Sequence, residues 1–313
     1  MVGPRAVSGG SSLTGLDGSA LSAFIILVLL GGANAVAVRF SNLELPPFWG
    51  AALRFCFTAI IFWVLVLVRK SCLPRGTGLI GTVLYGFLSV GASYAFLYWG
   101  LLRVQAGLTM VVLAFVPLLT QLLAWLHGLE PLRWRGLVGA VIALAGILFG
   151  IREGLGTTIP VLSLLALVAG AACIAEASVV FKLFPQSDPV VTNALAVTTG
   201  ALMLIGVSLI AGEAWLLPSA PRTWLAFIYL VVIGSVLLFY LYLFVLARWT
   251  ATASSYSFLL FPVATVFLAA WIAGERVTAS FVVGGVVVLV GVWFAALSGA
   301  SKAVKRPASA SPD

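Results

Sequence analysis

Few side chains in this sequence could do chemistry, and the most unusual of them is a carboxylate inside an apolar run. Glu176 lies in the stretch Ala-Cys-Ile-Ala-Glu-Ala-Ser. A charge at this depth in a membrane costs about 3 kcal/mol or more unless water or a partner solvates it. Two interpretations follow. Glu176 either faces a cavity and binds a proton or a substrate amine, or it reaches water at the helix end near Lys182.

Two further polar residues, Arg54 and Asn34, lie in apolar runs nearer the N-terminus. The guanidinium of Arg54 would either contact an anion, such as a substrate carboxylate, or have a structural role, in which it snorkels to the outer interface or bonds to the carbonyls of another helix. The amide of Asn34 donates and accepts hydrogen bonds, which suits a zwitterion, although the same group can hold two helices together. The sequence leaves both pairs of alternatives open.

Four tyrosines are candidates for contact with a solute. Tyr94 and Tyr98 are four residues apart, so they share one face of a helix. Tyr240 and Tyr256 lie in two later apolar runs. A wall of tyrosines can stack on an aromatic or cationic solute. The alternative for all four is packing or an interfacial belt.

The sequence shows no pattern of residues that is typical of an enzyme. His127 is the single histidine, and the cysteines Cys56, Cys72 and Cys173 lack metal-binding spacing. We find no Ser/His/Asp set and no Gly-rich phosphate loop. We therefore expect no catalytic residue, no metal and no cofactor, and no ATP-driven pumping.

The rest of the chain consists mainly of long apolar runs. Hydrophobic residues make up 62% of the sequence, charged residues 8%, and the mean hydropathy is +1.19. Soluble proteins carry roughly 25% charged residues, so a soluble fold of this size could not cover its surface. About 20 apolar residues span a hydrocarbon core. We predict an all-α integral membrane protein with ten transmembrane helices at 20–39, 47–68, 78–101, 104–127, 136–151, 160–184, 188–211, 222–247, 251–273 and 279–299.

The cations predict the orientation of these helices. Ten spans place both termini on one side of the membrane. If that side is the cytoplasm, it holds eleven Lys and Arg residues, the opposite side holds five, and Arg54 lies within a span. Positive residues concentrate on the cytoplasmic side of membrane proteins. We predict a multi-pass protein of the cell membrane with both termini in the cytoplasm, surrounded by lipid and without a nucleic-acid partner.

The two ends of the chain differ in composition from the apolar runs between them. Residues 1–18 are rich in Gly and Ser, residues 300–313 are polar and basic, and we expect both to be disordered tails. The first apolar run and Ala33-Asn34-Ala35 resemble a signal peptide with its cleavage site. However, Arg5 lies far from the run, which continues to Val38. We expect the run to be retained as the first span.

The sequence also repeats itself. A shift of 145 residues aligns 106–149 with 251–294, and a shift of 142 places Asn34 opposite Glu176. Each repeat, at 19–151 and 157–299, holds five of the predicted helices. Because five is odd, the second repeat must enter the membrane inverted, as in many secondary transporters. The pairs least expected by chance are Pro117/Pro262, Glu130/Glu275, Gly139/Gly284, Gly146/Gly291, Arg103/Arg248 and Pro47/Pro189.

Three stretches carry a family resemblance: 31–55, 114–150 and 258–294. They are similar to EamA-type members of the drug/metabolite transporter superfamily, whose pattern has a mid-helix proline, an apolar run ending in Gly-Glu-Arg and a Gly-rich helix. Pro262 and Gly274-Glu275-Arg276 match that pattern, whereas the first repeat has Leu129-Glu130-Pro131. The resemblance covers about residues 20–299 and implies ten helices in two repeats that export small metabolites or amino acids.

These observations favour a carrier with a small-molecule substrate. Pro117 and Pro262 would act as hinges, because proline removes a backbone hydrogen bond, while Glu130 and Glu275 would anchor helix ends. Export of lipophilic cations is the alternative, and a membrane enzyme or a receptor fits the sequence less well. Proton coupling through Glu176 is an option, and the oligomeric state is left open.

Overall fold

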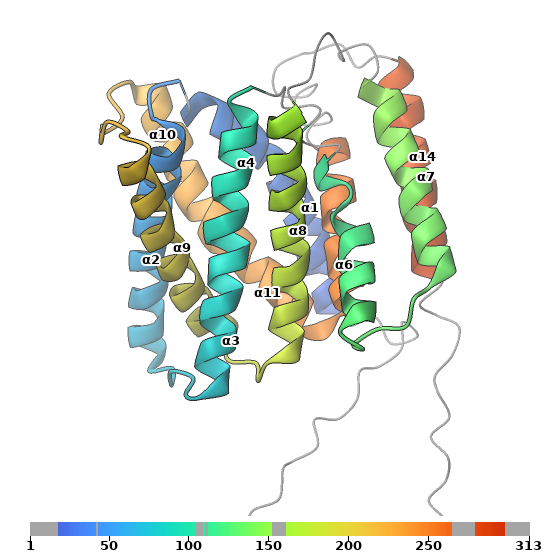
Figure 1. Cartoon of the computed structure of the whole chain (residues 1–313), viewed down its shortest axis with the longest axis horizontal. Coiled ribbons are helices and arrows are strands. Elements are labelled where there is room, and N and C mark those ends of the chain that lie inside the picture. The colour runs from blue at the N-terminus through green and yellow to red at the C-terminus, as the bar shows by residue number, and fades with distance from the viewer. Residues whose placement is uncertain are drawn as a thin grey trace, which may run out of the picture.

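The computed structural model describes residues 18–41, 43–103, 109, 112–151, 161–264 and 279–297. These residues form a helical bundle and include no strand (Figure 1). The first half contains α1 (Gly18–Ser41), α2 (Pro47–Arg69), α3 (Thr77–Gly86), η2 (Phe87–Ala92), α4 (Ser93–Leu101), α6 (Val116–Leu126) and α7 (Trp134–Ile151). The second half contains α8 (Val161–Leu183), α9 (Pro189–Ile210), α10 (Pro221–Val231), η4 (Val232–Leu237), α11 (Leu238–Arg248), α12 (Ala251–Ser255) and α14 (Ala279–Leu297).

The apolar runs are helical because lipid offers no hydrogen bonds to a bare backbone. The helices long and apolar enough to cross a membrane are Pro47–Arg69, Thr77–Leu101, Val161–Leu183, Pro189–Ile210 and Pro221–Arg248. Shorter apolar helices occupy the other runs, at Gly18–Asn34, Val116–Leu126, Trp134–Phe149, Ala251–Ala264 and Val282–Ala295. The all-α prediction is therefore confirmed. Apart from Gly18, the predicted tails lie outside the described residues.

Two of the long helices contain a π-helical segment at equivalent places. η2 joins α3 to α4, and η4 joins α10 to α11. Val232 follows Phe87 by 145 positions, which is the shift of the sequence repeat. Because π-helical turns are rare, their recurrence extends the repeat upstream of residue 106. Such turns often occur at functional sites, so the residues around η2 and η4 are candidates for a functional site.

The equivalent helices α7 and α14 lie side by side and run in opposite directions (Figure 1). Gly139 in α7 approaches Gly291 in α14, and Gly146 approaches Gly284. A Cβ added to Gly139 or Gly146 would overlap a carbonyl oxygen of the facing helix. Glycine permits such close contact between helix backbones in membranes. The early part of α7 thus meets the late part of α14.

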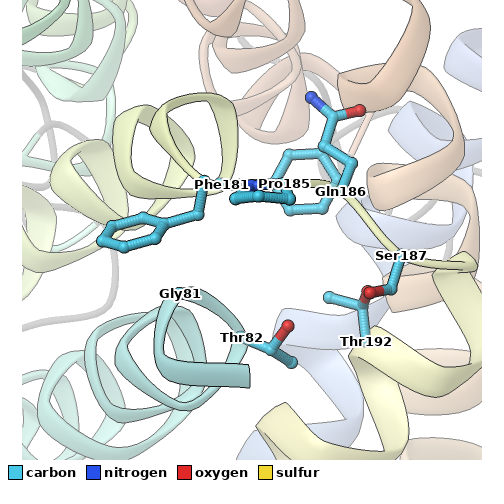
Figure 2. A pocket seen from close by; sticks show the side chains of 8 residues that line it. Gly81, Thr82, Phe181, Pro185, Gln186, Ser187 and Thr192 are labelled. Atoms are coloured by element: carbon cyan, nitrogen blue, oxygen red, sulfur yellow. The ribbon is translucent and has the colours of Figure 1, made fainter. Parts of the chain in front are cut away.

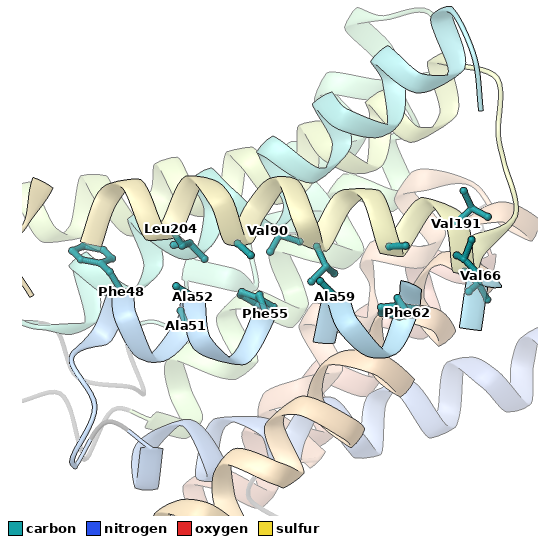
Figure 3. Packing of buried hydrophobic residues seen from close by; sticks show 14 of the residues in the cluster. Phe48, Ala51, Ala52, Phe55, Ala59, Phe62, Val66, Val90, Val191 and Leu204 are labelled. Carbon is teal, nitrogen blue, oxygen red and sulfur yellow. The ribbon is translucent and has the colours of Figure 1, made fainter. Parts of the chain in front are cut away.

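The equivalent helices α2 and α9 are also antiparallel (Figure 3). Phe48 at the start of α2 lies near the end of α9, and Val66 lies beside Val191 at its start. Their shared core is made of Ala51, Ala52, Phe55, Ala59, Phe62, Ala194, Val197, Ala201 and Leu204. Since two pairs of equivalent helices run in opposite directions, the second half is inverted relative to the first.

Two carboxylates in connecting segments cap helices of the opposite half. Glu213 accepts the backbone N–H groups of Phe48 and Trp49 over 3.1 and 2.6 Å at the start of α2. Glu44 accepts the backbone N–H of Ser219 over 2.7 Å, beside the start of α10. Hydrogen bonds from the Ser219 backbone and the Thr223 hydroxyl lower the pKa of Glu44 to about 2. These caps tie the two halves together at one end of the bundle.

The predicted helix breaks and anchors have mixed outcomes. Pro117 lies in the first turn of α6, directly after a turn at 114–115. Pro262 lies in helical residues 257–264, after an interruption at Tyr256. Glu130 accepts the backbone N–H of Thr252 over 3.3 Å, which confirms it as a helix-end anchor. Residues 274–276, with the predicted anchor Glu275, lie outside the described part of the chain.

Candidate substrate site

A cavity of about 660 Å³ lies between the two halves. This volume lies within the 300–1,000 Å³ range that is usual for small-molecule sites. Residues of α1, α3, η2, α4, α8, α9 and α11 contribute to its wall. The lining residues are Gly31, Asn34, Val38, Leu43, Tyr85, Ser89, Val90, Tyr94, Leu97, Tyr98, Leu101, Thr109, Leu113, Ile174, Ala177, Ser178, Asn193, Leu238, Phe239, Tyr242, Phe258 and Phe261.

Aromatic rings form much of this wall. The ring centroids of Tyr94 and Tyr98 are 6.0 Å apart, and those of Tyr242 and Phe258 are 5.9 Å apart. Tyr94 and Phe239 approach within 6.5 Å across the two halves. Such rings provide a large apolar surface with specific geometry for a flat solute. Tyr94 and Tyr98 both line the cavity, as two residues on one helix face can, and their contact with a substrate stays a prediction.

Equivalent residues of the two sequence repeats line the cavity wall. Three pairs of lining residues are separated by the repeat shift of 145 positions. The cavity therefore lies where equivalent surfaces of the two halves meet, as in many carriers built from inverted repeats. These pairs are Tyr94/Phe239, Leu97/Tyr242 and Leu113/Phe258.

Three polar groups of the wall have no hydrogen-bond partner among the described residues. They are Oδ1 of Asn34, Oγ of Ser89 and Nδ2 of Asn193. Asn193 is 1% exposed. A buried donor without an acceptor costs roughly 1–3 kcal/mol, so these groups are suited to bind the polar end of a solute or ordered water. By contrast, Ser178 shares a 2.8 Å hydrogen bond with the Tyr242 hydroxyl.

Arg54 lies directly behind this wall and is 1% exposed. Its Nε donates to Oγ of Ser235 and its Nη2 donates to the carbonyl of Gly234, each over 2.7 Å. Its guanidinium carbon lies 5.8 Å from the ring centroid of Tyr94. Its Nη1 has no hydrogen-bond partner in the described structure. The bonds to η4 agree with the structural alternative for Arg54, and the orphaned Nη1 leaves the binding alternative open.

Glu176 does not line the cavity in the described structure. Its Oε1 lies 3.4 Å from Nε2 of His127, at the end of α6. The cavity face of α8 carries Ile174, Ala177 and Ser178, with the spacing of one helical face. Glu176 is rotated away from that face. The prediction that it forms the polar centre of the cavity therefore differs from the structure, and its role in binding stays a prediction.

The remaining predicted tyrosines do not line the cavity either. Tyr256 is buried in a core cluster with Phe24 and Leu259. Tyr240 packs against the α2–α9 core, with its ring centroid 6.2 Å from that of Phe244. Both residues follow the packing alternative. The lining residues that the sequence argument missed include Tyr85, Ser89, Asn193, Phe239, Tyr242 and Phe258. The repeat could have identified Phe239, as the equivalent of the candidate Tyr94.

A second hollow lies between the start of α3 and the connection from α8 to α9. Figure 2 shows Thr82 and Thr192 facing Phe181 and Gln186 across it. Its volume is about 10 Å³, which admits no more than about one water molecule. This hollow is too small for a substrate.

Comparison with known proteins gives one family. The model of the EamA-like transporter family matches residues 18–152 and 161–297, one match for each half. A relative in Escherichia coli strain K12, named "Uncharacterized inner membrane transporter YedA", is 27% identical over 82% of this chain and 83% of its own length. A relative in Bacillus subtilis strain 168, named "Uncharacterized transporter YyaM", is 25% identical over 86% of this chain and 92% of its own length.

A solved crystal structure has the same fold. It aligns with a TM-score of 0.73 at 23% identity and covers 90% of this chain and 97% of its own. At this identity the likeness concerns the arrangement of helices only.

Proposed function

The chain belongs to the EamA-like transporter family, and from this premise we propose that it exports small metabolites, such as amino acids, by alternating access through the central cavity. The observation that carries the proposal is a cavity of about 660 Å³ walled by repeat-equivalent residues of two inverted halves. Inverted halves give two openings of similar energy, which is what a carrier requires.

The proposal includes a specific topology. Ten spans cross the cell membrane, and both termini are cytoplasmic because the cations concentrate on that side. The native Cys72 is exposed between α2 and α3 and can report on this arrangement. An impermeant maleimide should reach Cys72, and a cysteine introduced at Arg248, from the same cytoplasmic side. Labelling of these two positions from opposite sides would rule out ten spans.

The first apolar run is part of the proposed carrier. α1 contributes Gly31, Asn34 and Val38 to the cavity wall. Cleavage after residue 35 would remove Gly31 and Asn34 from that wall and break the first span, so the mature protein should retain the run. Sequencing of the purified protein from its N-terminus would give a start at Val36 if this part of the proposal were wrong.

The two π-helical segments are the proposed moving parts, together with the breaks before Pro117 and Pro262. η2 carries the lining residues Ser89 and Val90, and η4 holds Arg54. π-helical turns inside α-helices occur frequently at functional sites, which favours these two segments as the places where the bundle changes shape. Motion there would change the wall directly.

Transport by reconstituted protein tests the proposal. Proteoliposomes holding wild-type protein should exchange internal for external labelled substrate from a panel of amino acids and lipophilic cations. Ala177→Trp fills the cavity and should reduce exchange by about tenfold or more, which corresponds to about 1.4 kcal/mol on the barrier. The control is Gly285→Ala, because a Cβ at Gly285 meets no neighbour. Unchanged exchange by the filled variant would exclude the central cavity as the route.

Export of lipophilic cations is the alternative substrate class. The aromatic wall favours it, because tyrosine and phenylalanine faces attract cations. Uptake of tetraphenylphosphonium, measured in the same vesicles, separates this alternative from metabolite export.

Proton coupling is proposed through the Glu176–His127 pair. Oε2 of Glu176 is buried and accepts no hydrogen bond from a described residue, so it is a position where a proton can bind. Glu176→Gln keeps the volume and removes that position. The pH profile of exchange should flatten in this variant, whereas an unaltered profile would assign Glu176 to helix packing.

A further inference from the structure

The charge of the cavity wall indicates what kind of solute it accepts. The described lining residues include no Asp, Glu, Lys or Arg. Glu176, which could have bound an ammonium group, faces His127 instead. The wall therefore offers a cation its ring faces and neutral acceptors but no carboxylate.

A buried positive charge lies behind this wall. Arg54 donates hydrogen bonds to the neutral groups of Ser235 and Gly234, and no described carboxylate forms an ion pair with it. A buried guanidinium without a counter-ion is costly. Hydrogen bonds to neutral groups orient the charge but leave its positive field uncompensated.

Arg54 and the wall are in close contact. The guanidinium approaches the ring of Tyr94, and a Cβ built on Gly234 would meet both Asn34 and, at 3.5 Å, Nη2 of Arg54. Tyr94 and Asn34 line the cavity. The unpartnered donor of Asn193 lies on the same cavity. An uncompensated cation thus lies behind the wall at Tyr94 and Asn34, and an orphaned amide donor lies on the wall at Asn193.

From this juxtaposition we propose that the cavity selects solutes that carry a carboxylate, or another monoanionic group, on an aromatic or apolar body. The inference rests on the proposed function and adds the charge of the substrate to it. The field of Arg54 stabilises the anionic group at the Tyr94 and Asn34 side of the cavity, because anions are favoured beside buried cations. The Asn193 amide adds a free donor to the same cavity. The aromatic wall holds the body. Zwitterionic amino acids carry the carboxylate but also an ammonium group. Lipophilic cations lack the anionic group.

Four indole probes with one ring system and different charges test the selection. Indole-3-acetate is an anion, indole-3-acetamide is neutral, tryptamine is a cation and tryptophan is a zwitterion. Calorimetric titration of the purified full-length protein measures their affinities. We expect indole-3-acetate to bind about tenfold or more tightly than tryptamine, a difference of about 1.4 kcal/mol, with indole-3-acetamide between them. Equal or tighter binding of tryptamine, or binding of none of the four, would overturn the inference.

Two variants connect the selection to the named residues. Arg54→Gln should bring the ratio of acetate to tryptamine affinity close to one while changing indole-3-acetamide binding less. Asn193→Asp places a negative charge in the cavity with little change of volume and should reverse the ratio, so it keeps the test decisive if Arg54→Gln does not fold. Gln186→Glu is the control, because it adds the same charge at an exposed position outside the cavity. An unchanged ratio in Asn193→Asp would contradict the proposal.

The same probes separate the inference from the proposed function. Binding with the expected preference but no exchange across vesicles would refute the carrier and retain the anion site. Exchange of all four probes at equal rates would retain the carrier and refute the anion site.

Discussion

Gly139 in α7 faces Gly291 in α14 at such close range that a Cβ on either residue would overlap the carbonyl oxygen of the other. The repeat relates Gly139 to Gly284 and Gly146 to Gly291. The contact between Gly146 and Gly284 is therefore the symmetry counterpart of this one. Both contacts depend on residues without a side chain.

Gly139→Ala should force these two helices apart. The carbonyl of Gly291 belongs to the backbone and cannot rotate out of the way, so the helices must separate and lose packing. Overpacking of this kind costs about 1–3 kcal/mol. The melting temperature of the purified protein should fall by several degrees. The matched control is Gly285→Ala, where the Cβ meets open space and helix propensity predicts a small gain. Equal behaviour of the two variants would contradict the close contact.

Glu213→Gln tests the cap at the start of α2. Glu213 accepts the N–H groups of Phe48 and Trp49 and the hydroxyl of Ser208. The amide side chain has one acceptor oxygen where the carboxylate has two, and it lacks the charge that favours a helix N-terminus. Loss of a cap costs about 0.5–2 kcal/mol. Hydrogen exchange at residues 48 and 49 should accelerate, while exchange in the middle of α2 stays at the wild-type rate. Unchanged exchange at both amides would show that Glu213 is dispensable.

Glu44 makes stability depend on pH in the acid range. Its pKa is lowered to about 2 by hydrogen bonds from the Ser219 backbone and the Thr223 hydroxyl, whereas an unfolded glutamate titrates near 4.3. The contribution of Glu44 to stability is therefore complete above about pH 4.3 and is lost as the pH falls toward 2. The difference in melting temperature between wild type and Glu44→Gln should be constant from pH 7 to about 5. It should shrink between pH 4.3 and 3. A difference that grows on acidification would have the wrong sign.

The sequence predicted the helices and their inversion because both depend on features that a sequence displays. Long apolar runs mark the helices, and the repeat of Pro47 at Pro189 and of Gly139 at Gly284 marks their equivalence. The antiparallel packing of α2 with α9 and of α7 with α14 agrees with that reasoning. The π-helical segments could not be predicted, since their local sequences are ordinary apolar stretches.

The site was harder to predict because depth does not determine the direction of a side chain. Glu176 was placed opposite Asn34 by the shift of 142 residues. The lining residues Gly31 and Asn34 of α1 instead correspond to Ile174 and Ala177 of α8, a shift of 143. One residue along a helix is a rotation of about 100°, from its 3.6 residues per turn. That rotation is enough to turn a carboxylate from the cavity toward α6.

Ser235→Ala tests how the buried guanidinium of Arg54 is held. The Ser235 hydroxyl accepts from Nε of Arg54 over 2.7 Å and donates to the Leu230 carbonyl over 2.9 Å. Its removal leaves a charged donor without an acceptor inside the bundle, and a hydrogen bond to a charged group contributes about 1.5–3 kcal/mol. The free energy of unfolding, measured by detergent titration, should fall by about that amount. Ser257→Ala is the control, because Ser257 is equally buried and only donates to the Ser254 carbonyl.

A double-mutant cycle separates this bond from the rest of the Ser235 environment. In an Arg54→Met background no charged donor needs an acceptor, so Ser235→Ala should lose most of its cost there. The coupling energy between the two positions should be roughly 1 kcal/mol or more, as for other residues in direct contact. If Ser235→Ala costs the same in both backgrounds, the 2.7 Å contact contributes nothing to stability. Arg54 would then be held by its bond to the Gly234 carbonyl and by the rings of Phe55 and Tyr94.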